Sequence, residues 1–310
     1  MSDFQHTAAL GAGVIGASWT ALFLASGRSV AVHDPAGNAE KTVRDYVEMA
    51  WPTLTELGLT AAGDPNAVTF HRSAAAAVEG ASFIQESVPE RIEIKHALFA
   101  EIEPAIDKDA VVASSASGLT LSEMQAGWRD PARLVLGHPF NPPHLIPLVE
   151  VMGNDKTADG VAEAAEGFYK AVGKVTIRVR REMPGHVANR LQAAVWREAI
   201  HLVKEGVASV EDVDTAMWAG PGLRWAAMGP TMLFHLGAGE AGLTSFCDRY
   251  TDSFNRWWDD LGVLHLDAET AEQLIEGVAA EAGDETTAKL SAKRDAMITA
   301  MQKAMADLRS

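Results

Sequence analysis

The segment Gly11-Ala12-Gly13-Val14-Ile15-Gly16 constrains the fold more than any other part of the chain. It follows a short β-prone run at residues 8–10 and opens a helical run, as the G-x-G-x-x-G turn of a dinucleotide site does. The first glycine makes the tight turn, the second lets the backbone approach a pyrophosphate, and the third lets the helix pack on the strand. The N–H groups that begin the helix, including those of Val14 and Ile15, can then meet the phosphates. Turns that serve packing alone can share this pattern, so the surrounding sequence has to decide.

An acidic residue ends the next predicted strand. Residues 30–33 form a β-prone run that leads to Asp34, 23 residues after Gly11. Dinucleotide folds place a ribose-binding carboxylate about 20 residues after the glycine turn. No arginine stands beside Asp34 to hold a 2′-phosphate. The sequence therefore predicts NAD rather than NADP, the alternative being that Asp34 is a solvated acid at a strand end.

Short β-rich runs alternate with helical patterns over the first 180 residues, which is typical of a parallel sheet covered by helices. The predicted strands are residues 8–10, 30–33, 83–85, 111–114, 134–137, 148–151 and 175–179. Pro184 and Gly185 then interrupt the pattern, and the rest of the chain reads as helical. We expect an α/β protein: a Rossmann-type doubly wound parallel sheet in a dinucleotide-binding domain (residues 1–182), followed by an all-helical C-terminal domain (residues 183–310) with the active site between them.

Charge and cysteine content exclude several classes of function. The 310 residues include 26 Lys and Arg and 42 Asp and Glu, a formal net charge of −16, which repels nucleic acid and anionic lipid. Cys247 is the single cysteine, so the chain has neither an internal disulfide nor a cysteine-ligated zinc, and we predict a reducing, cytoplasmic location and no metal site. Residues 8–27 are uncharged, but no Lys or Arg precedes them and glycines interrupt them, so we expect a buried strand–turn–helix rather than a signal or membrane span.

The centre of the chain holds residue types suited to oxidising an alcohol. His138 lies in Gly-His-Pro-Phe-Asn-Pro, Glu150 lies in a predicted strand 12 residues later, and a serine cluster ends at Ser117. Removing a hydride from an alcohol needs a base for the hydroxyl proton, and histidine titrates near neutral pH. A carboxylate on the other ring nitrogen fixes the tautomer and stabilises the imidazolium. An isolated histidine would more often be structural, but the three residues together indicate a catalytic set.

These motifs, together with Leu-Val-Glu-Val at residues 148–151 and Pro-Gly-His-Val-Ala-Asn-Arg at residues 184–190, resemble the 3-hydroxyacyl-CoA dehydrogenase superfamily. The resemblance extends from the glycine turn to about residue 250. It implies that Ser117 hydrogen-bonds the reacting oxygen, that His138 is the catalytic base with Glu150 as its partner, and that Asn189 contacts the substrate. It also implies a homodimer formed through the helical domain.

The same resemblance assigns cofactor contacts to Ser87, Glu90 and Lys95. The alternative for Glu90 and Lys95 is a solvated ion pair on a helix. Where the family usually has asparagine, this chain has Ser115, which leaves the cofactor contact there open. That serine is shared by a branch acting on free hydroxy acids, which includes L-carnitine dehydrogenase and L-gulonate 3-dehydrogenase with its relative lambda-crystallin.

Charge also bears on the substrate. Residues 36–64 contain two basic and five acidic residues, whereas a coenzyme A thioester calls for a basic cradle. A small free acid needs one cation for its carboxylate, and Arg224 is our candidate, the alternative being an ordinary structural arginine. A trimethylammonium group would favour an aromatic cage. The pattern does not say whether any aromatic residues of the second domain converge; they are Trp196, Trp218, Trp225, Phe234, Phe246, Tyr250, Phe254, Trp257 and Trp258.

We therefore predict an NAD-dependent enzyme that oxidises the 3-hydroxyl of a small free hydroxy acid, of L-carnitine or L-gulonate type, to the 3-keto acid. One alternative is a dehydrogenase of short 3-hydroxyacyl-CoA thioesters. A second is a crystallin-like protein that binds NAD without catalysis, although a non-catalyst would have no need of Ser117, His138, Glu150 and Asn189 together.

Overall fold

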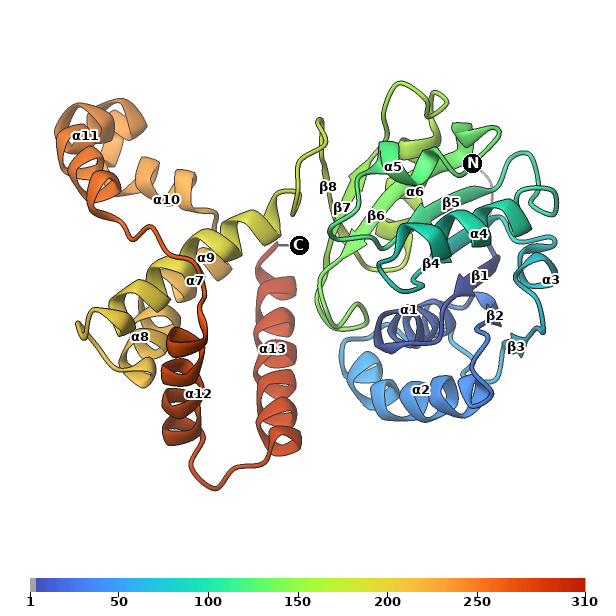
Figure 1. Cartoon of the computed structure of the whole chain (residues 1–310), viewed down its shortest axis with the longest axis horizontal. Coiled ribbons are helices and arrows are strands. Elements are labelled where there is room, and N and C mark those ends of the chain that lie inside the picture. Colours follow the sequence, from blue (N-terminus) through green and yellow to red (C-terminus); the bar gives the residue numbers. More distant parts are fainter. Residues whose placement is uncertain (1–3, 310) are drawn as a thin grey trace. The chain divides into compact units, whose positions relative to one another are not determined.

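The computed structural model describes residues 4–309, which divide into two compact units. The first unit comprises residues 4–188 and 295–304, and the second comprises residues 189–294 and 305–309. All described strands lie in the first unit, whereas the second unit is built from helices (Figure 1). The predicted fold class, a Rossmann-type sheet followed by a helical region, is confirmed.

The first unit contains an eight-stranded sheet. Its strands are β1 (His6–Leu10), β2 (Ser29–His33), β3 (Val68–Phe70), β4 (Phe83–Glu86), β5 (Val111–Ser114), β6 (Leu134–Pro139), β7 (Leu148–Met152) and β8 (Val175–Arg178). All seven predicted strands are present. β3 was not predicted, because three residues are too few to show an alternating pattern.

The strand order is β3-β2-β1-β4-β5-β6-β7-β8. Neighbouring strands run parallel except for β6 and β7, which are antiparallel. We had expected a sheet that is parallel throughout, so the structure departs from this prediction at one strand pair. The order reverses between β1 and β4, and ligands of such sheets bind at the carboxyl ends of the strands beside this reversal. The loops after β1, β2, β4 and β5 are therefore the ones that can form a cofactor site.

Helices cover both faces of this sheet. One face carries α1 (Val14–Ala25), α2 (Ala39–Glu56) and α6 (Val161–Ala171), and the other carries α3 (Ala74–Val78), α4 (Ile92–Ile102) and α5 (Leu121–Gln125), with a short 3-10 turn, η1 (Pro131–Arg133), before β6. Alternate residues of a strand serve opposite faces: Ala9 belongs to the first apolar cluster, whereas Ala8 and Leu10 belong to the second.

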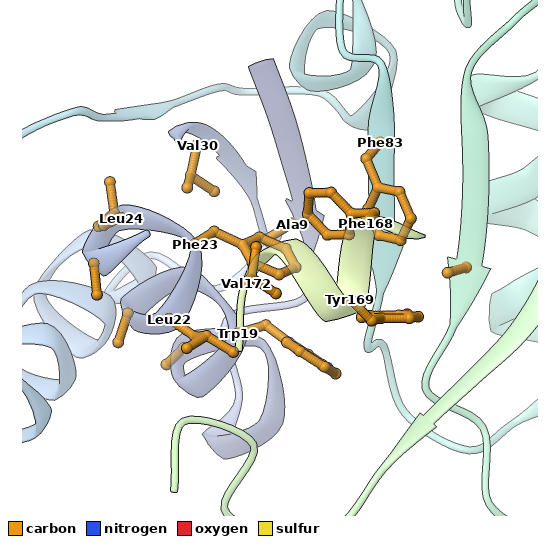
Figure 2. Close-up of a cluster of buried hydrophobic side chains, with 14 of the residues drawn as sticks. Ala9, Trp19, Leu22, Phe23, Leu24, Val30, Phe83, Phe168, Tyr169 and Val172 are labelled. Atoms are coloured by element: carbon orange, nitrogen blue, oxygen red, sulfur yellow. The ribbon is translucent and has the colours of Figure 1, made fainter. Parts of the chain in front are cut away.

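The aromatic centre of the first cluster holds α1 and α6 against β4 (Figure 2). The rings of Phe83 and Phe168 stack with centroids 3.8 Å apart, and Trp19 lies 5.4 Å from Tyr169. Residues 16–25 of α1 are all buried, which explains why residues 8–27 carry no charge. Within residues 4–309, no helix has the length and apolar character needed to cross a membrane.

The second unit begins with α7 (Ala188–Lys204), whose first residue still belongs to the first unit. It continues with α8 (Val210–Met217), η2 (Trp218–Gly222), α9 (Leu223–Ala227), α10 (Pro230–Gly237), η3 (Gly239–Ala241), α11 (Gly242–Asp260), α12 (Ala268–Ala282) and α13 (Thr287–Arg309). Residues 295–304 of α13 belong to the first unit, where Gln302 donates to the carbonyl of Leu145. Many large apolar side chains of the second unit are exposed, including Leu191, Trp196, Trp218, Trp258 and Ile275.

Candidate active site

The three glycines of the turn after β1 have different environments. Gly11 has φ +100°, and a Cβ there would lie 2.6 Å from the carbonyl oxygen of Ser87. A Cβ on Gly16 would collide with the carbonyl of Gly11, so both glycines are required by packing within the protein. Gly13 differs, because its backbone is extended and a Cβ there would meet no atom of the described residues within 4 Å. Packing within the protein therefore does not require glycine at position 13, and the open space there, referred to below as the cradle, leaves room for a ligand.

The start of α1 offers hydrogen-bond donors at this cradle. Gly13 is the N-cap residue, and no side chain among residues 4–309 caps this end of the helix. The first N–H groups of α1 are therefore available to an anion, which the helix dipole also attracts. Val14 is 59% exposed despite being apolar, as expected for a residue on the rim of a ligand site. Ile15 is half-buried and packs against the first apolar cluster.

Asp34 stands at the end of β2, as predicted. One carboxylate oxygen accepts a hydrogen bond from the backbone N–H of Ala12 (2.7 Å), and the other accepts one from Ala36 (2.8 Å). The carboxylate thus supports the glycine turn as well as carrying a negative charge beside it. Each carboxylate oxygen has a second lone pair left for a ribose hydroxyl.

Ser115 and Ser87 lie together within a polar network. Their hydroxyl oxygens are 2.8 Å apart, and Gln85 Nε2 donates to Ser115 over 2.9 Å. The Trp19 indole N–H also donates to Ser115, over 3.3 Å. The Tyr169 hydroxyl donates to Gln85 Oε1 over 2.6 Å, and because burial raises the pKa of this tyrosine, the hydroxyl keeps its proton. Sequence analysis did not identify Trp19, Gln85 or Tyr169, because their pairing becomes visible only in the folded sheet.

Lys95 does not form the solvated pair with Glu90 that we considered. Its ammonium lies 2.7 and 2.8 Å from the two carboxylate oxygens of Glu86, and both side chains are at most 1% exposed. Ser114 also donates to Glu86, as does the N–H of Val88. A buried carboxylate needs such partners to remain charged. This ion pair therefore stabilises the loop after β4, because Glu86 also bonds the backbone of Val88 in that loop.

Glu90 is likewise engaged with the protein. One of its carboxylate oxygens accepts hydrogen bonds from three successive backbone N–H groups, those of Ser117 (3.0 Å), Gly118 (2.7 Å) and Leu119 (2.9 Å). Glu90 thereby fixes the loop that carries Ser117. The side chain of Ser117 is exposed and open to a ligand.

His138 and Glu150 meet on the two antiparallel strands, β6 and β7. His138 is 5% exposed and Glu150 is fully buried, and Nδ1 of the histidine lies 2.8 Å from Oε2 of the glutamate. The other oxygen of Glu150 accepts hydrogen bonds from the N–H groups of Val187 and Ala188. Burial raises the pKa of Glu150, but the hydrogen bond from His138 and those from Ala188 and Val187 outweigh burial, so the pKa of Glu150 lies below the usual range. Glu150 therefore stays ionised, and His138 can donate from Nδ1 and leave Nε2 as a proton acceptor.

Sequence analysis also missed His186. This residue is 4% exposed, its ring centroid lies 5.1 Å from that of His138, and its Nε2 lies 3.3 Å from the carbonyl oxygen of Ala116, the residue before Ser117. The motif at residues 184–190 had drawn attention only to Asn189. A histidine directly after a Pro-Gly turn was the signal that could have revealed it.

Asn189 and Arg224 belong to the second unit, at the start of α7 and in the exposed α9. Some of the aromatic residues do converge within this unit. Phe234 of α10 packs on Phe246 and Phe254 of α11, which contact the remaining rings of one cluster: Tyr250, Trp257 and Trp258.

Known proteins with similar sequences match along nearly the whole chain. The model of the 3-hydroxyacyl-CoA dehydrogenase NAD binding domain matches residues 6–183, and that of the 3-hydroxyacyl-CoA dehydrogenase C-terminal domain matches residues 185–280. The L-carnitine dehydrogenase of Nocardiopsis dassonvillei is 44% identical over 98% of this chain and 92% of its own length. That of a Pseudomonas species is 42% identical over 98% of this chain and 95% of its own length.

A solved structure extends the likeness to three dimensions. It is that of 5-formyl-3-hydroxy-2-methylpyridine 4-carboxylic acid 5-dehydrogenase, an NAD⁺-dependent dismutase, with a TM-score of 0.83 and 30% identity, covering 97% of this chain and 98% of the other. The open cradle at Gly13 and the carboxylate of Asp34 fit the NAD that the matched domain binds. The chain therefore belongs to the 3-hydroxyacyl-CoA dehydrogenase family, and it is an NAD-dependent oxidoreductase.

Proposed function

We propose that this enzyme oxidises the 3-hydroxyl group of L-carnitine, or of a closely similar small free hydroxy acid, to the 3-keto acid. The observation that carries the proposal is the buried His138–Glu150 pair, whose histidine ring lies beside that of His186, which in turn bonds the carbonyl of Ala116 next to Ser117. The full-length similarity to proteins named L-carnitine dehydrogenase supports the choice of substrate.

In the proposed mechanism His138 is the catalytic base. Glu150 accepts a hydrogen bond from Nδ1–H of His138, so the free lone pair is on Nε2 and can take the proton of the substrate hydroxyl. Ionised Glu150 then stabilises the imidazolium that forms. Ser117 hydrogen-bonds the reacting oxygen, and Glu90 keeps its loop in place. The glycine turn and Asp34 would hold NAD⁺, which would supply the hydride acceptor for the carbon that carries the hydroxyl.

For the cofactor, we propose contacts from the glycine turn, from Asp34, and from Ser87 and Ser115 in the loops after β4 and β5. For Glu90 and Lys95 we propose an indirect role in place of direct contacts to the cofactor. Both are engaged in holding these loops, so we propose that they act on the cofactor through the loop backbone.

The charges of α2 support a free acid over a coenzyme A thioester. Its two cations each have an acidic partner one turn away: Lys41 lies 2.5 Å from Asp45, and Arg44 lies 2.8 Å from Glu40. Such exposed pairs are weak, about 0.2–1 kcal/mol, but they cancel the positive field that would attract a polyanion. The helix α2 thus presents no net positive charge to the phosphates of coenzyme A.

Substrate contacts from the second unit are proposed at Asn189 and Arg224, the latter for the carboxylate. The aromatic cluster of α10 and α11 supports a trimethylammonium substrate, because accessible aromatic faces attract quaternary cations. Tyr250, Trp257 and Trp258 of this cluster are 44–62% exposed, so their faces are accessible.

We further propose that the protein forms a homodimer and is located in the cytoplasm. For the domains, we propose a boundary between residues 182 and 183. The exposed apolar side chains of the helical unit support self-association, because monomeric proteins seldom leave so many uncovered. The single cysteine supports a reducing compartment.

The test is NADH formation from NAD⁺ by the purified protein with L-carnitine, L-gulonate and 3-hydroxybutyrate, and NADH consumption with acetoacetyl-CoA. We expect the highest kcat/KM with L-carnitine. Efficient reduction of acetoacetyl-CoA without turnover of any free acid would favour the thioester alternative. NAD binding without turnover of any of these substrates would favour the crystallin-like alternative.

A further inference from the structure

The backbone at His186 is unusual. Its φ angle is +49°, and it is the only residue other than glycine with a positive φ among residues 4–309. Gly185 before it is also left-handed, with φ +76°. Side chains with a Cβ avoid this region, and residues held there often serve a functional site. The turn at residues 183–186 is closed by a hydrogen bond from the N–H of His186 to the carbonyl of Met183.

This conformation directs His186 and the two residues after it to three parts of the site. The imidazole Nε2 donates to the carbonyl of Ala116, which precedes Ser117. The ring lies 5.1 Å from that of His138, with 53° between the planes. The next two N–H groups, of Val187 and Ala188, donate to Glu150. One turn thus contacts the base, its carboxylate partner and the segment of the substrate serine.

We infer that His186 is a positioning residue, which holds the ring of His138 and the Ala116–Ser117 segment in register with each other. This inference rests on the proposed function of His138 and Ser117. It goes beyond that function because it assigns the relative placement of base and serine to a residue that need not touch the substrate.

The tautomer follows from the contacts. A carbonyl oxygen can only accept, so Nε2 of His186 carries the hydrogen and Nδ1 is unprotonated when the ring is neutral. Nδ1 is buried and has no hydrogen-bond partner among the described residues. Burial, above all, lowers the pKa of His186; His138 lowers it further, whereas the Ala116 carbonyl, Glu150 and Glu90 raise it. A neutral ring beside His138 does not repel the imidazolium formed when the base takes a proton.

Two substitutions of His186 distinguish a role of its side chain in positioning from a role of its backbone conformation alone. Gln places an amide nitrogen where histidine has Nε2, so His186→Gln keeps a donor for Ala116. His186→Asn places it nearer the backbone, short of that carbonyl, yet asparagine tolerates the left-handed conformation better than glutamine. A purely structural role therefore favours the Asn variant, whereas a positioning role favours the Gln variant.

The experiment compares kcat, KM, the NAD dissociation constant and the unfolding temperature of wild type, H186Q and H186N with L-carnitine. We expect H186Q to keep most of the wild-type kcat and H186N to lose at least about tenfold, with NAD binding unchanged in both, because misplacing reacting groups by about 1 Å can cost up to about 100-fold. An H186N variant as active as H186Q, or more active, would overturn the inference. If wild type oxidises no hydroxy acid, the proposed function fails instead.

A second test uses the wild-type protein, so it does not depend on whether a variant folds. In ¹⁵N-histidine NMR at neutral pH, His186 should show the neutral tautomer with hydrogen on Nε2. A neutral ring with its hydrogen on Nδ1 contradicts the contact with Ala116 and overturns the inference.

Discussion

His138 on β6 lies directly opposite Glu150 on β7, and its Nδ1 atom is 2.8 Å from a carboxylate oxygen of that residue. Antiparallel pairing places two residues 12 positions apart in the sequence side by side in the sheet. The hydrogen bond from His138, together with those from the N–H groups of Ala188 and Val187, holds the pKa of Glu150 below its usual range despite burial, so the carboxylate stays ionised. The pair is therefore arranged to hold one tautomer of His138.

Removing the base tests this arrangement. His138→Gln should lower kcat at least about 100-fold, the lower range for loss of a general base, with little change in NAD affinity. Glu150→Gln should act in the same direction but less severely, because the base remains. Steady-state kinetics and NAD titration measure both effects. Near-normal turnover of His138→Gln would exclude it as the base.

Gly13→Ala tests the cofactor cradle. The new Cβ meets no described atom, so stability should be unchanged, but it occupies the space that a pyrophosphate needs. We expect the NAD dissociation constant to rise about tenfold, corresponding to about 1.4 kcal/mol of lost hydrogen bonding. Gly167→Ala on α6, which also adds a Cβ in open space, is the matched control. Equal NAD affinity in the two variants would place the pyrophosphate elsewhere.

Asp34 should determine cofactor preference. Its carboxylate repels a 2′-phosphate and binds ribose hydroxyls. Asp34→Ser combined with Pro35→Arg should shift the ratio of kcat/KM values toward NADP. Because Asp34 also accepts from Ala12 and Ala36, some loss of activity with both cofactors is expected. A wild-type enzyme that already prefers NADP would refute this role.

Arg224 should hold the substrate carboxylate. A charge-assisted hydrogen bond contributes about 1.5–3 kcal/mol, so Arg224→Met should raise KM for the free acid about tenfold or more while NAD binding is unchanged. Arg249→Met, which removes another exposed arginine of the same unit, is the control. Both must be measured at one ionic strength, because salt screens exposed charges. If the two variants have the same KM, Arg224 is an ordinary structural arginine.

Lys174 provides a pH-dependent prediction. Its ammonium is buried, donates to the carbonyls of Pro143 and Ile146 in the loop after β6, and lies 5.2 Å from the ring centroid of Trp19. Burial lowers the pKa of Lys174 from 10.5 to about 7. Between these pH values the unfolded chain binds more protons than the folded protein, so this residue makes stability rise with pH there.

Lys174→Met removes that titration. The free energy of unfolding of wild type minus that of the variant should therefore increase from about pH 7 to about pH 10 and level off below pH 7. Urea denaturation of both proteins across this range measures the difference. A difference independent of pH would show that Lys174 keeps its ordinary pKa.

The sequence alone determined the features that depend on neighbouring residues. The glycine turn, the acid that ends β2 and the alternation of strands and helices are local patterns, and seven strands and the helical second unit followed from them. The expected pairing of His138 with Glu150, 12 residues later, is also present in the structure, because a short antiparallel connection brings such residues opposite each other.

Only the tertiary structure decided which partners the charged and polar side chains take. A solvated pair with Glu90 was the alternative considered for Lys95, but Lys95 pairs with Glu86, because both side chains are buried and a buried ammonium needs a buried carboxylate. Glu90 instead binds the backbone N–H groups of the Ser117 loop, 27 residues away in the sequence. His186 contacts Ala116 and His138 from still farther along the chain. Such pairings depend on strand order and register, which bring distant loops to one edge of the sheet, and no local sequence pattern encodes them.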